Sequence, residues 1–429
     1  MKYKGSMYNL YYQKDDEHWL IFNTLSGGLC LVDPETYVSI LNGYPESGKW
    51  FQDLFEQGYI VACKKDECGT LRYKRILYMF KDSSTVSFVI APCMTCNLRC
   101  IYCFERQYIP KLSAQKAAMD DETANRCTQF IEGYCSRIKP ERLHIQWFGG
   151  EPLLCYDRII DMSSKLIKFC ENQSIEYSSF MITNGLLLNN KKIDTLSERC
   201  KVTHFQFTLD GDASHFAKYK QAPIIEYTNL INNIKYATGR TLVSVRMNVS
   251  RENEDAILRT AIALAKSCDN PDHLKIYASK IYGKDNEGCH CLTDGEFEEF
   301  RVKFDAILKE MNAGNGSIPI RSARRLTYCP SMTKDHFVID PNGDIYKCEC
   351  EIGNENEVIG NLKCGLYHNQ AESKYFFETV PEKCQRCSYY PLCHHGCITA
   401  RLNHGRIVDC DAFRRRIDNK IKDEILGSS

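Results

Sequence analysis

Four cysteines fall within the eleven residues CMTCNLRCIYC, from position 93 to position 103. Three of them, Cys96, Cys100 and Cys103, have the spacing C-x3-C-x2-C. Three thiolates can hold a [4Fe–4S] cluster through three irons and leave the fourth iron open to a ligand. A structural zinc site needs four closed ligands, and Cys93 would supply the fourth. The sequence therefore predicts a metal centre at this segment.

A second group of cysteines follows in the last part of the chain, in a longer pattern that chance seldom produces. The whole sequence has 24 cysteines among 429 residues and no apolar segment of a secretory signal at its start. In a reducing compartment, clustered cysteines more often bind metal than form disulfides. We therefore expect a cytoplasmic, metal-binding protein. The second group comprises Cys329, Cys348, Cys384, Cys387, Cys393, Cys397 and Cys410.

Composition and charge exclude several other classes of protein. The chain balances 55 Lys and Arg against 55 Asp and Glu. This neutral balance gives no electrostatic reason to expect nucleic acid or an anionic membrane as a partner. No run of 18 apolar residues occurs, so we expect no membrane span. The length predicts two or three domains.

The elements that must position the first cysteines alternate between strands and helices. Six strand-like segments are separated by helix-like ones, which predicts a parallel sheet. We expect an α/β fold in which residues 83–314 form a partial (β/α)6 TIM-like barrel. The predicted strands cover residues 85–92, 142–150, 177–185, 202–211, 241–250 and 274–283, and the predicted helices cover residues 122–138, 157–173, 191–200, 228–239, 254–268 and 294–314.

Short polar or glycine-rich motifs follow the ends of the predicted strands. GGEP follows the second strand, TNG the third and LDG the fourth. In barrels the chemistry lies at the carboxyl ends of the strands, so these motifs and the cysteine segment would converge on one mouth. A zinc knuckle gives no reason for this agreement, which favours the iron–sulfur interpretation.

Two flanking regions differ from this pattern. Residues 1–82 contain three strand-like runs followed by three helix-like ones, which predicts a winged-helix-like domain. Residues 315–429 are short on regular structure and rich in cysteine, and a region of this kind usually needs metal to fold. We expect it to form a cysteine-rich iron–sulfur domain.

The motifs resemble those of the radical S-adenosylmethionine (SAM) enzymes. CNLRCIYC resembles their cluster loop, and WFGGEPLL resembles their glycine-rich strand-end motif. The resemblance implies that the methionine part of SAM chelates the open iron and that its cleavage yields a 5′-deoxyadenosyl radical. It also implies that the backbone of Gly149 and Gly150 and the carboxylate of Glu151 receive the cofactor ammonium.

The same resemblance implies further cofactor contacts. One aromatic residue would pack near the adenine, and four polar residues fall where the family contacts ribose and carboxylate. Family members often carry a histidine followed by an arginine after the Asp-Gly pair, whereas this chain has HFAKYK at residues 215–220, without an arginine. The residues with these implied roles are Tyr102 for the adenine, and Thr183, Asn184, Thr208 and Asn248 for the others.

The later cysteines resemble the SPASM domain, an auxiliary-cluster module of radical SAM enzymes that act on peptides and proteins. The resemblance implies two auxiliary [4Fe–4S] clusters, and therefore three clusters in all. For one of them the fourth ligand is either Cys350 or a substrate thiolate. His394 and His395 could also be ligands, although hydrogen bonding to the ligands is the favoured role. The implied ligands are Cys384, Cys387, Cys393 and Cys410 for one cluster, and Cys329, Cys348 and Cys397 for the other.

Two substrate classes compete. Sulfatase maturases, which make formylglycine, usually carry an aspartate after the cysteine that matches Cys348; Glu349 stands here as a candidate catalytic base. Ribosomal-peptide maturases often begin with a winged-helix-like element that captures a leader peptide along a strand edge, and residues 1–82 resemble that element. We expect an oxidoreductase that removes a hydrogen from such a precursor peptide and installs a thioether crosslink. Epimerisation, carbon–carbon crosslinking and formylglycine formation are the alternatives, and reduced ferredoxin or flavodoxin is the expected electron donor.

Overall fold

The computed structural model describes residues 2–81, 84–107, 118–268, 270–282, 290–311, 326–327 and 329–423. The chain divides into two compact units, each built from segments that lie far apart in the sequence. The terminal unit comprises Met1–Lys81, Ile318–Lys334 and Tyr375–Ser429, and the sheet unit comprises Asp82–Ser317 and Asp335–Lys374. The three domains expected from the sequence stay a prediction.

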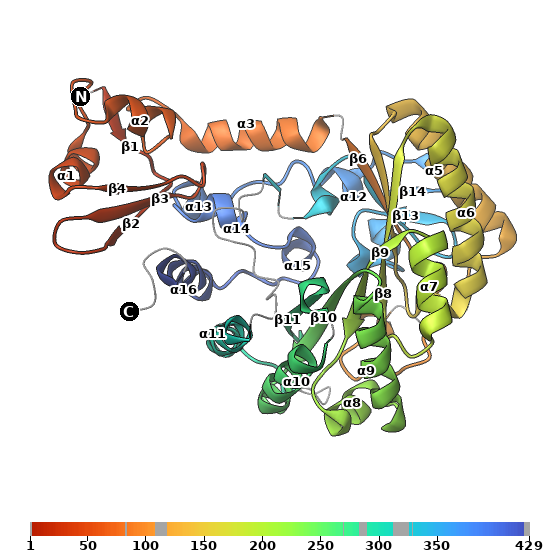
Figure 1. Cartoon of the computed structure of the whole chain (residues 1–429). Coiled ribbons are helices and arrows are strands. Elements are labelled where there is room, and N and C mark those ends of the chain that lie inside the picture. The colour runs from red at the N-terminus through yellow and green to blue at the C-terminus, as the bar shows by residue number, and fades with distance from the viewer. Residues whose placement is uncertain are drawn as a thin grey trace. The chain divides into compact units, whose positions relative to one another are not determined.

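A ten-stranded sheet dominates the sheet unit, in the order β11-β10-β9-β8-β7-β6-β12-β13-β14-β15. Strands β6 to β11 are parallel and neighbour one another in chain order (Figure 1). All six predicted strands are confirmed, and so is an α/β fold with a large, mostly parallel sheet; the TIM-like partial barrel stays a prediction. The six are β6 Thr85–Ile90, β7 Arg142–Trp147, β8 Glu176–Thr183, β9 Val202–Thr208, β10 Leu242–Val249 and β11 Leu274–Lys280.

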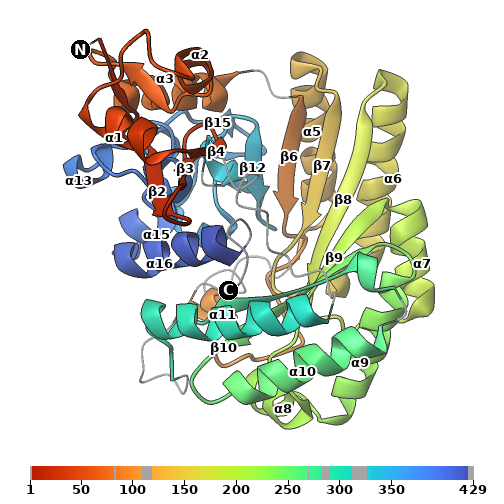
Figure 2. The same ribbon diagram turned by 60° about the vertical axis from the view of Figure 1, so that its left-hand side comes forward.

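Helices connect these strands and cover one face of the sheet (Figure 2). Side chains at their N-termini satisfy backbone donors: Asp120 accepts from Thr123 N, and Asn189 accepts from Lys192 N. The predicted helices are confirmed, and α8 is an addition in the HFAKYK segment. The helices are α5 Asp121–Ile138, α6 Tyr156–Gln173, α7 Asn190–Arg199, α8 Ala213–Lys220, α9 Ile225–Thr238, α10 Glu254–Ser267 and α11 Asp294–Glu310.

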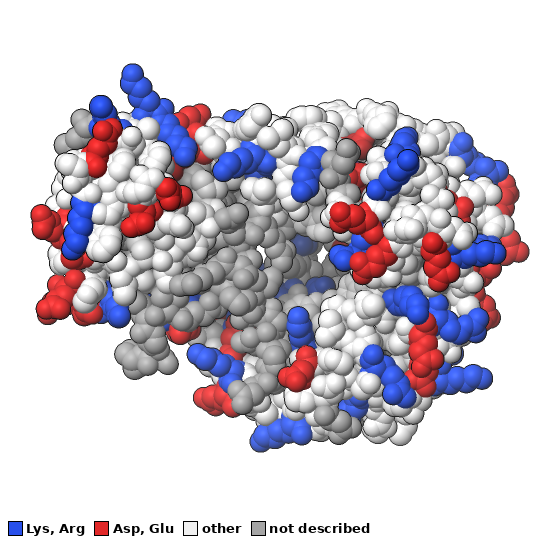
Figure 3. All heavy atoms as spheres, turned by 45° about the horizontal axis from the view of Figure 1, so that its top comes forward, with Lys and Arg blue, Asp and Glu red and all other residues white. Residues whose placement is uncertain are grey.

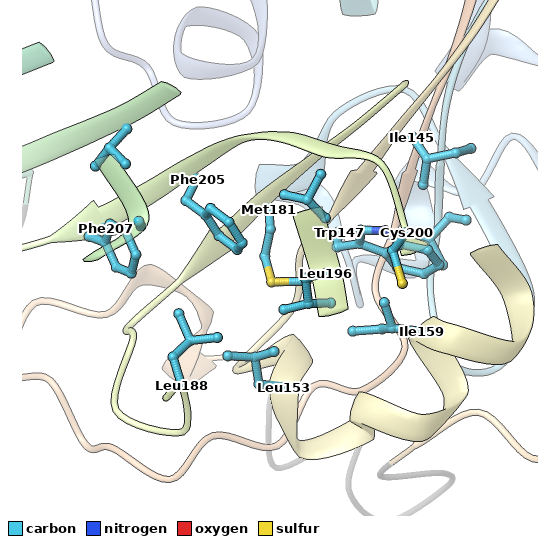
Figure 4. Close-up of a cluster of buried hydrophobic side chains, with 14 of the residues drawn as sticks. Ile145, Trp147, Leu153, Ile159, Met181, Leu188, Leu196, Cys200, Phe205 and Phe207 are labelled. Atoms are coloured by element: carbon cyan, nitrogen blue, oxygen red, sulfur yellow. The ribbon is translucent and has the colours of Figure 1, made fainter. Parts of the chain in front are cut away.

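A hydrophobic core fills the space between the sheet and these helices. Figure 4 shows Trp147, Met181 and Phe205 from three neighbouring strands beside Ile159 and Leu196 from two helices, all of them fully buried. Burying one such side chain contributes about 1.5–3 kcal/mol. The core therefore fixes the strand ends, where the predicted site residues lie.

The chain returns to the sheet after α11, so the prediction of little regular structure there is wrong for residues 336–366. Strand β12 pairs in parallel with β6, and three further strands extend the sheet in antiparallel pairs. All four residues of β12 are buried, so its sequence shows no polar alternation by which a strand is recognised. These strands are β12 His336–Ile339, β13 Asp344–Tyr346, β14 Gly360–Asn361 and β15 Gly365–Leu366, and helix α12 Gln370–Ser373 follows.

The terminal unit contains the three strands and three helices predicted at the start of the chain, with β2, β3 and β4 in one antiparallel sheet. Two further short strands, β1 and β5, pair with each other. The winged-helix-like identity of this region stays a prediction. Its elements are β1 Tyr3–Gly5, β2 Asn9–Gln13, β3 Trp19–Asn23, β4 Leu29–Val32, α1 Pro34–Asn42, α2 Phe51–Glu56, β5 Ile60–Ala62 and α3 Glu67–Phe80.

The last segment of the chain packs against β2 and β3 of the same unit. Ile417 and Ile421 are buried with Leu10 and Phe22, and Tyr12 donates a 2.6 Å hydrogen bond to Asp418. Helix α16 Cys410–Ile421 has 12 residues. The other helices described in this segment have only four or five residues: α13 Glu382–Gln385, α14 Tyr390–Cys393 and α15 Ile398–Leu402.

Acidic and basic side chains intermingle on the face shown in Figure 3, without a large area of one sign. None of the helices within the described ranges combines the length and the apolar content that a bilayer crossing requires. No disulfide joins any of the cysteines that the structure describes.

Candidate active site

The predicted cysteines lie in a loop that follows β6, residues 91–103, which we call the cluster loop. The neighbouring loop after β7 holds it by backbone hydrogen bonds: Gly150 N donates to Cys93 O at 3.2 Å, and Glu151 N donates to Thr95 O at 2.9 Å. The cluster loop is thus tied to the GGEP motif, as expected from the strand order.

The two glycines of GGEP are required by this contact. A Cβ atom on Gly149 would lie 2.2 Å from the carbonyl oxygen of Cys93, and one on Gly150 would lie 2.4 Å from that of Thr95. Gly149 also has a φ of 113°, which disfavours any other residue. The glycines therefore bring two loops together, a reason for their presence that the sequence did not reveal.

Cys96, Cys100 and Cys103 are partly exposed, whereas Cys93 is buried. Burial raises the pKa of Cys96 to about 11 and that of Cys103 to about 12, and the charges of the neighbouring thiols contribute. The Sγ of Cys93 instead donates to the carbonyl oxygen of Glu151 at 3.2 Å. The thiols of Cys96, Cys100 and Cys103 can therefore serve as the three ligands of such a cluster, and Cys93 is not needed.

Within the described residues, no comparable set of ligands is placed to bind a single metal ion. No group of three or more His, Cys, Asp or Glu within the described part of the chain lies close enough to hold one ion. Ligands that bind different irons of a cluster do not need to meet at one point, so this finding is compatible with a cluster held by the trio.

Glu151 is fully buried, and its carboxylate joins two segments. Its Oε1 accepts hydrogen bonds from Thr183 Oγ1 at 2.7 Å and Leu153 N at 3.0 Å, and its Oε2 accepts one from Asn184 N at 2.8 Å. Burial raises the pKa of Glu151 to about 7, although these hydrogen bonds oppose the shift. The carboxylate therefore connects GGEP to TNG.

The TNG loop in turn reaches the cluster loop. The side-chain amide of Asn184 donates to Asn97 Oδ1 at 2.8 Å and lies 3.9 Å from the Sγ of Cys96. Thr183 and Asn184, both predicted site residues, are thus beside the cysteines and Glu151.

A second buried group of charged and polar residues lies against the cluster loop, where Arg99 N donates to Lys220 O. Asp210 is fully buried, and Lys220 is 3% exposed. Lys220 Nζ lies 3.1 Å from Asp210 and donates to the hydroxyl of Tyr102 at 2.6 Å. Tyr102 donates to Asp210, which also accepts from the backbone and the side chain of Asn248.

Neighbouring charges affect the pKa of Lys220. Burial, the largest single effect, lowers it, but the charge of Asp210, a hydrogen bond to that residue and the charges of Cys100 and Cys96 together raise the pKa above its ordinary value. Burial and the charge of Asp210 raise the pKa of Tyr102, which keeps its proton. Lys220 and Asp210 were missed in the sequence, although Lys220 ends the HFAKYK segment in which the family's arginine is absent.

Two other predicted residues are not part of these networks. Thr208 ends β9 and is in register with Arg246 of β10. Glu349 lies in the sheet unit just after Cys348, and burial raises the pKa of its half-buried carboxyl. The sequence-based role of each stays a prediction.

The terminal unit brings together four of the later cysteines. Burial, and then the charges of Cys387 and Cys410, raise the pKa of Cys384. Burial also raises the pKa of Cys393, and the charges of Cys410, Cys384 and Cys387 add to this effect. Arg414 points a guanidinium nitrogen at Cys387 Sγ, 3.9 Å away. These four are the cysteines assigned to one auxiliary cluster. Of the other predicted trio, Cys329 and Cys397 belong to the terminal unit and Cys348 to the sheet unit.

The sequence is similar to those of known enzymes. Residues 90–263 match the Radical SAM superfamily. The radical SAM cyclopropyl synthase TigE of Paramaledivibacter caminithermalis is 23% identical, with 96% of this chain and 94% of that protein covered. The cysteine-type anaerobic sulfatase-maturating enzyme of Clostridium novyi is 24% identical, with 73% and 88% covered.

Solved structures share the fold. The enzyme anSMEcpe with bound AdoMet superposes with a TM-score of 0.59 at 17% identity, over 78% of this chain and 96% of that one. Streptococcus suis SuiB bound to precursor peptide SuiA superposes with a TM-score of 0.52 at 14% identity, over 92% and 95%. At these identities the similarity concerns the fold.

Proposed function

We propose that this chain, an enzyme of the radical SAM superfamily, removes a hydrogen atom from a peptide at the cluster loop. The observation that carries the proposal is the set of Cys96, Cys100 and Cys103 in a loop joined to GGEP and TNG by hydrogen bonds. When bound there, the [4Fe–4S] cluster and SAM supply a radical that can attack unactivated carbon.

The residues around the cluster loop fit the amino-acid part of SAM. That part carries an ammonium and a carboxylate, and a buried acid and a buried cation both lie near the loop. Glu151 provides the acid and Lys220 the cation, which takes the role of the missing arginine. Tyr102 remains a neutral hydroxyl beside the cysteines and offers its ring to the adenine.

The terminal unit offers a place for the leader of a precursor peptide. Strand β4 is an edge strand, paired with β3 and with no other described strand. A groove of about 470 Å³ runs between β4 and α2, with Leu29, Val32, Trp50, Leu54 and Tyr59 among its lining residues. An extended peptide that pairs with a free edge gains main-chain hydrogen bonds, and the groove can accept its side chains.

Auxiliary clusters are part of the proposal. Mutual electrostatic effects among Cys384, Cys387, Cys393 and Cys410 support one [4Fe–4S] cluster in a SPASM-like domain. The second, with Cys329, Cys348 and Cys397 as ligands, rests on the sequence pattern.

The chemical outcome that we propose is a thioether crosslink: the hydrogen atom of a peptide carbon would leave in 5′-deoxyadenosine, the cysteine thiol would lose a proton, and the remaining electron would be accepted by an iron–sulfur cluster. A carbon–carbon bond is the second candidate, because a relative that aligns over nearly the full chain is a cyclopropyl synthase. Formylglycine formation is the third, since a sulfatase-maturating enzyme also aligns.

The test of the proposed activity is anaerobic incubation of the iron-loaded chain with SAM and dithionite. We expect 5′-deoxyadenosine from the wild type and none from Cys100→Ala. Absence of 5′-deoxyadenosine from an iron-loaded wild type contradicts the proposal. With a cysteine-containing precursor peptide, mass spectrometry and thiol alkylation separate the outcomes: a thioether consumes the thiol, and a carbon–carbon bond leaves it free.

A further inference from the structure

Polar side chains occupy the face of the parallel sheet that is turned away from the hydrophobic core. Along β9, Phe205 and Phe207 lie in the core between the sheet and the helices, so Gln206 between them belongs to the opposite face. Arg246 of β10 alternates with core residues in the same way. Tyr277 of β11 lies directly across from Arg246 in the strand register. Gln206, Arg246 and Tyr277 are half-buried, and we call them the polar trio.

The polar trio has hydrogen-bond donors that the described residues do not use. Arg246 donates from Nε to Asn248 Oδ1 at 3.0 Å, and its two terminal nitrogens have no partner among the described residues. The hydroxyl of Tyr277 donates to Gln206 Oε1 at 2.8 Å, which fixes that amide and leaves its NH2 group without a described partner. Burial raises the pKa of Tyr277, and the charge of Arg246 opposes this shift, so the guanidinium lies near the hydroxyl.

Arg246 also lacks an acidic partner. Two cations from neighbouring segments each have one, since Lys220 pairs with Asp210 and Arg251 pairs with Glu296. No acidic side chain in the described ranges forms an ion pair with Arg246, whose one printed hydrogen bond goes to a neutral amide. A charge that is partly removed from water needs a counterion or good hydrogen bonds. The free side of this guanidinium therefore indicates an anionic ligand.

The polar trio lies next to residues that are expected to contact the cofactor. Thr208 and Asn248 stand two residues further along the same strands and on the same face, about 7 Å nearer their carboxyl ends. Asn248, which accepts the hydrogen bond from Arg246, donates to Asp210 at 3.1 Å. Reacting atoms must approach to about 3–3.5 Å, so a substrate that gives a hydrogen atom to the cofactor has to lie close to this face.

We propose that Arg246 and Gln206 bind a carboxylate of the peptide substrate and so select a peptide that carries one near the residue that loses its hydrogen. The inference rests on the proposed function, because it requires SAM and a peptide at the same strand ends. A planar guanidinium offers two parallel N–H groups to a carboxylate, and the amide NH2 supplies a further donor. An acidic side chain and the C-terminus of the peptide are the two sources of such a carboxylate.

The test titrates three capped amino acids into the iron-loaded chain with SAM bound and its cluster oxidised, so that no cleavage occurs. N-acetylglutamate α-amide presents a side-chain carboxylate, N-acetylglycine presents a terminal carboxylate, and N-acetylglutamine α-amide presents neither. We expect calorimetry to show binding of at least one acidic probe, with the glutamine probe about tenfold to hundredfold weaker, the worth of one hydrogen bond to a charged group. The acidic probe that binds more tightly identifies the source of the carboxylate.

Substitutions then assign this binding to the guanidinium. Arg246→Gln should weaken the acidic probe by about tenfold to hundredfold, a larger loss than any for SAM. Arg251→Gln, on a half-exposed residue that follows β10 and pairs with Glu296, is the matched control and should change neither affinity. If Arg246→Gln unfolds or loses its iron, Arg246→Lys serves in its place. It keeps the charge without the planar fork and should still weaken the acidic probe severalfold.

Each other outcome overturns the inference. Equal affinities for the three probes do so, and so does the absence of binding by any probe to a chain that holds SAM. Unchanged probe binding in Arg246→Gln also overturns it. A loss of SAM affinity as large as the loss for the acidic probe does the same, because Arg246 then belongs to the cofactor site. A wild type that does not bind SAM refutes the proposed function itself, a result distinct from all of these.

Discussion

The two groups of cysteines are positioned in different ways. The cluster loop follows a strand of a large sheet, and hydrogen bonds tie it to GGEP and TNG. Cys384, Cys387 and Cys393 instead lie in or beside helices of four residues. Isolated helices of this length are not stable in water, so ligands or tertiary packing must hold them.

From this difference we infer that the fold forms the first site, whereas the second site, if it holds the proposed auxiliary cluster, would be formed by the metal. The core behind β6 to β9 is made mainly of apolar side chains from the strands and the helices that cover them, so we expect it to form whatever the cluster loop binds. The short helices of the tail have a smaller core, shared with β2 and β3. Metal removal should therefore affect the two regions unequally.

The largest expected effect is a complete loss of enzymatic activity in a protein that stays folded. Replacing Cys96, Cys100 and Cys103 together by Ala should abolish 5′-deoxyadenosine formation and remove about four irons per chain. Because the three side chains are partly exposed, the thermal unfolding of the sheet unit should shift by only a few degrees. Iron analysis measures the loss of iron, and circular dichroism measures the shift in thermal unfolding. Unchanged iron content contradicts the assignment of these cysteines as cluster ligands.

Removal of all iron by a chelator should reveal a clear difference in local stability between the two regions. Amide hydrogens in α13, α14 and α15 should lose protection from exchange, while those in β6 to β9 should keep it. Hydrogen exchange measured by mass spectrometry before and after chelation gives the comparison. Equal loss in both regions would show that the sheet also depends on the cluster.

The buried ion pair beside the cluster loop should contribute strongly to stability. Lys220→Ala leaves Asp210 as an uncompensated buried charge, which costs about 3–5 kcal/mol. Lys218→Ala, two residues earlier, removes an exposed pair with Glu252 and should cost about 0–1 kcal/mol. Urea unfolding measures both, and similar values for the two variants would contradict the role of Lys220.

A smaller effect is expected from the glycine that brings the two loops together. Gly149→Ala places a Cβ against the carbonyl of Cys93 in an unfavourable backbone conformation, at a cost of about 1–3 kcal/mol. Gly133→Ala in α5, where no atom lies within 4 Å of the added Cβ, should instead stabilise by about 1 kcal/mol. Urea unfolding of both variants tests whether their changes in stability have opposite signs.

The six parallel strands could be predicted because their apolar and polar residues alternate, as in LHIQW of β7. Strand β12 could not, because all of its residues are buried and its partner β6 lies some 250 residues earlier. The convergence of the strand-end motifs followed from the order of the strands. The pairing of Lys220 with Asp210, and the need of the glycines for close loop contact, depend on three-dimensional packing that no spacing encodes.

The central claim is that Cys96, Cys100 and Cys103 leave one iron open to SAM. Electron paramagnetic resonance of the anaerobically reconstituted and reduced chain tests it directly, with and without SAM. The account predicts that SAM changes the spectrum of one [4Fe–4S] cluster and that this cluster is missing when the three cysteines are replaced. Zinc bound to these cysteines in place of iron, or a SAM-sensitive signal that persists without them, would contradict it.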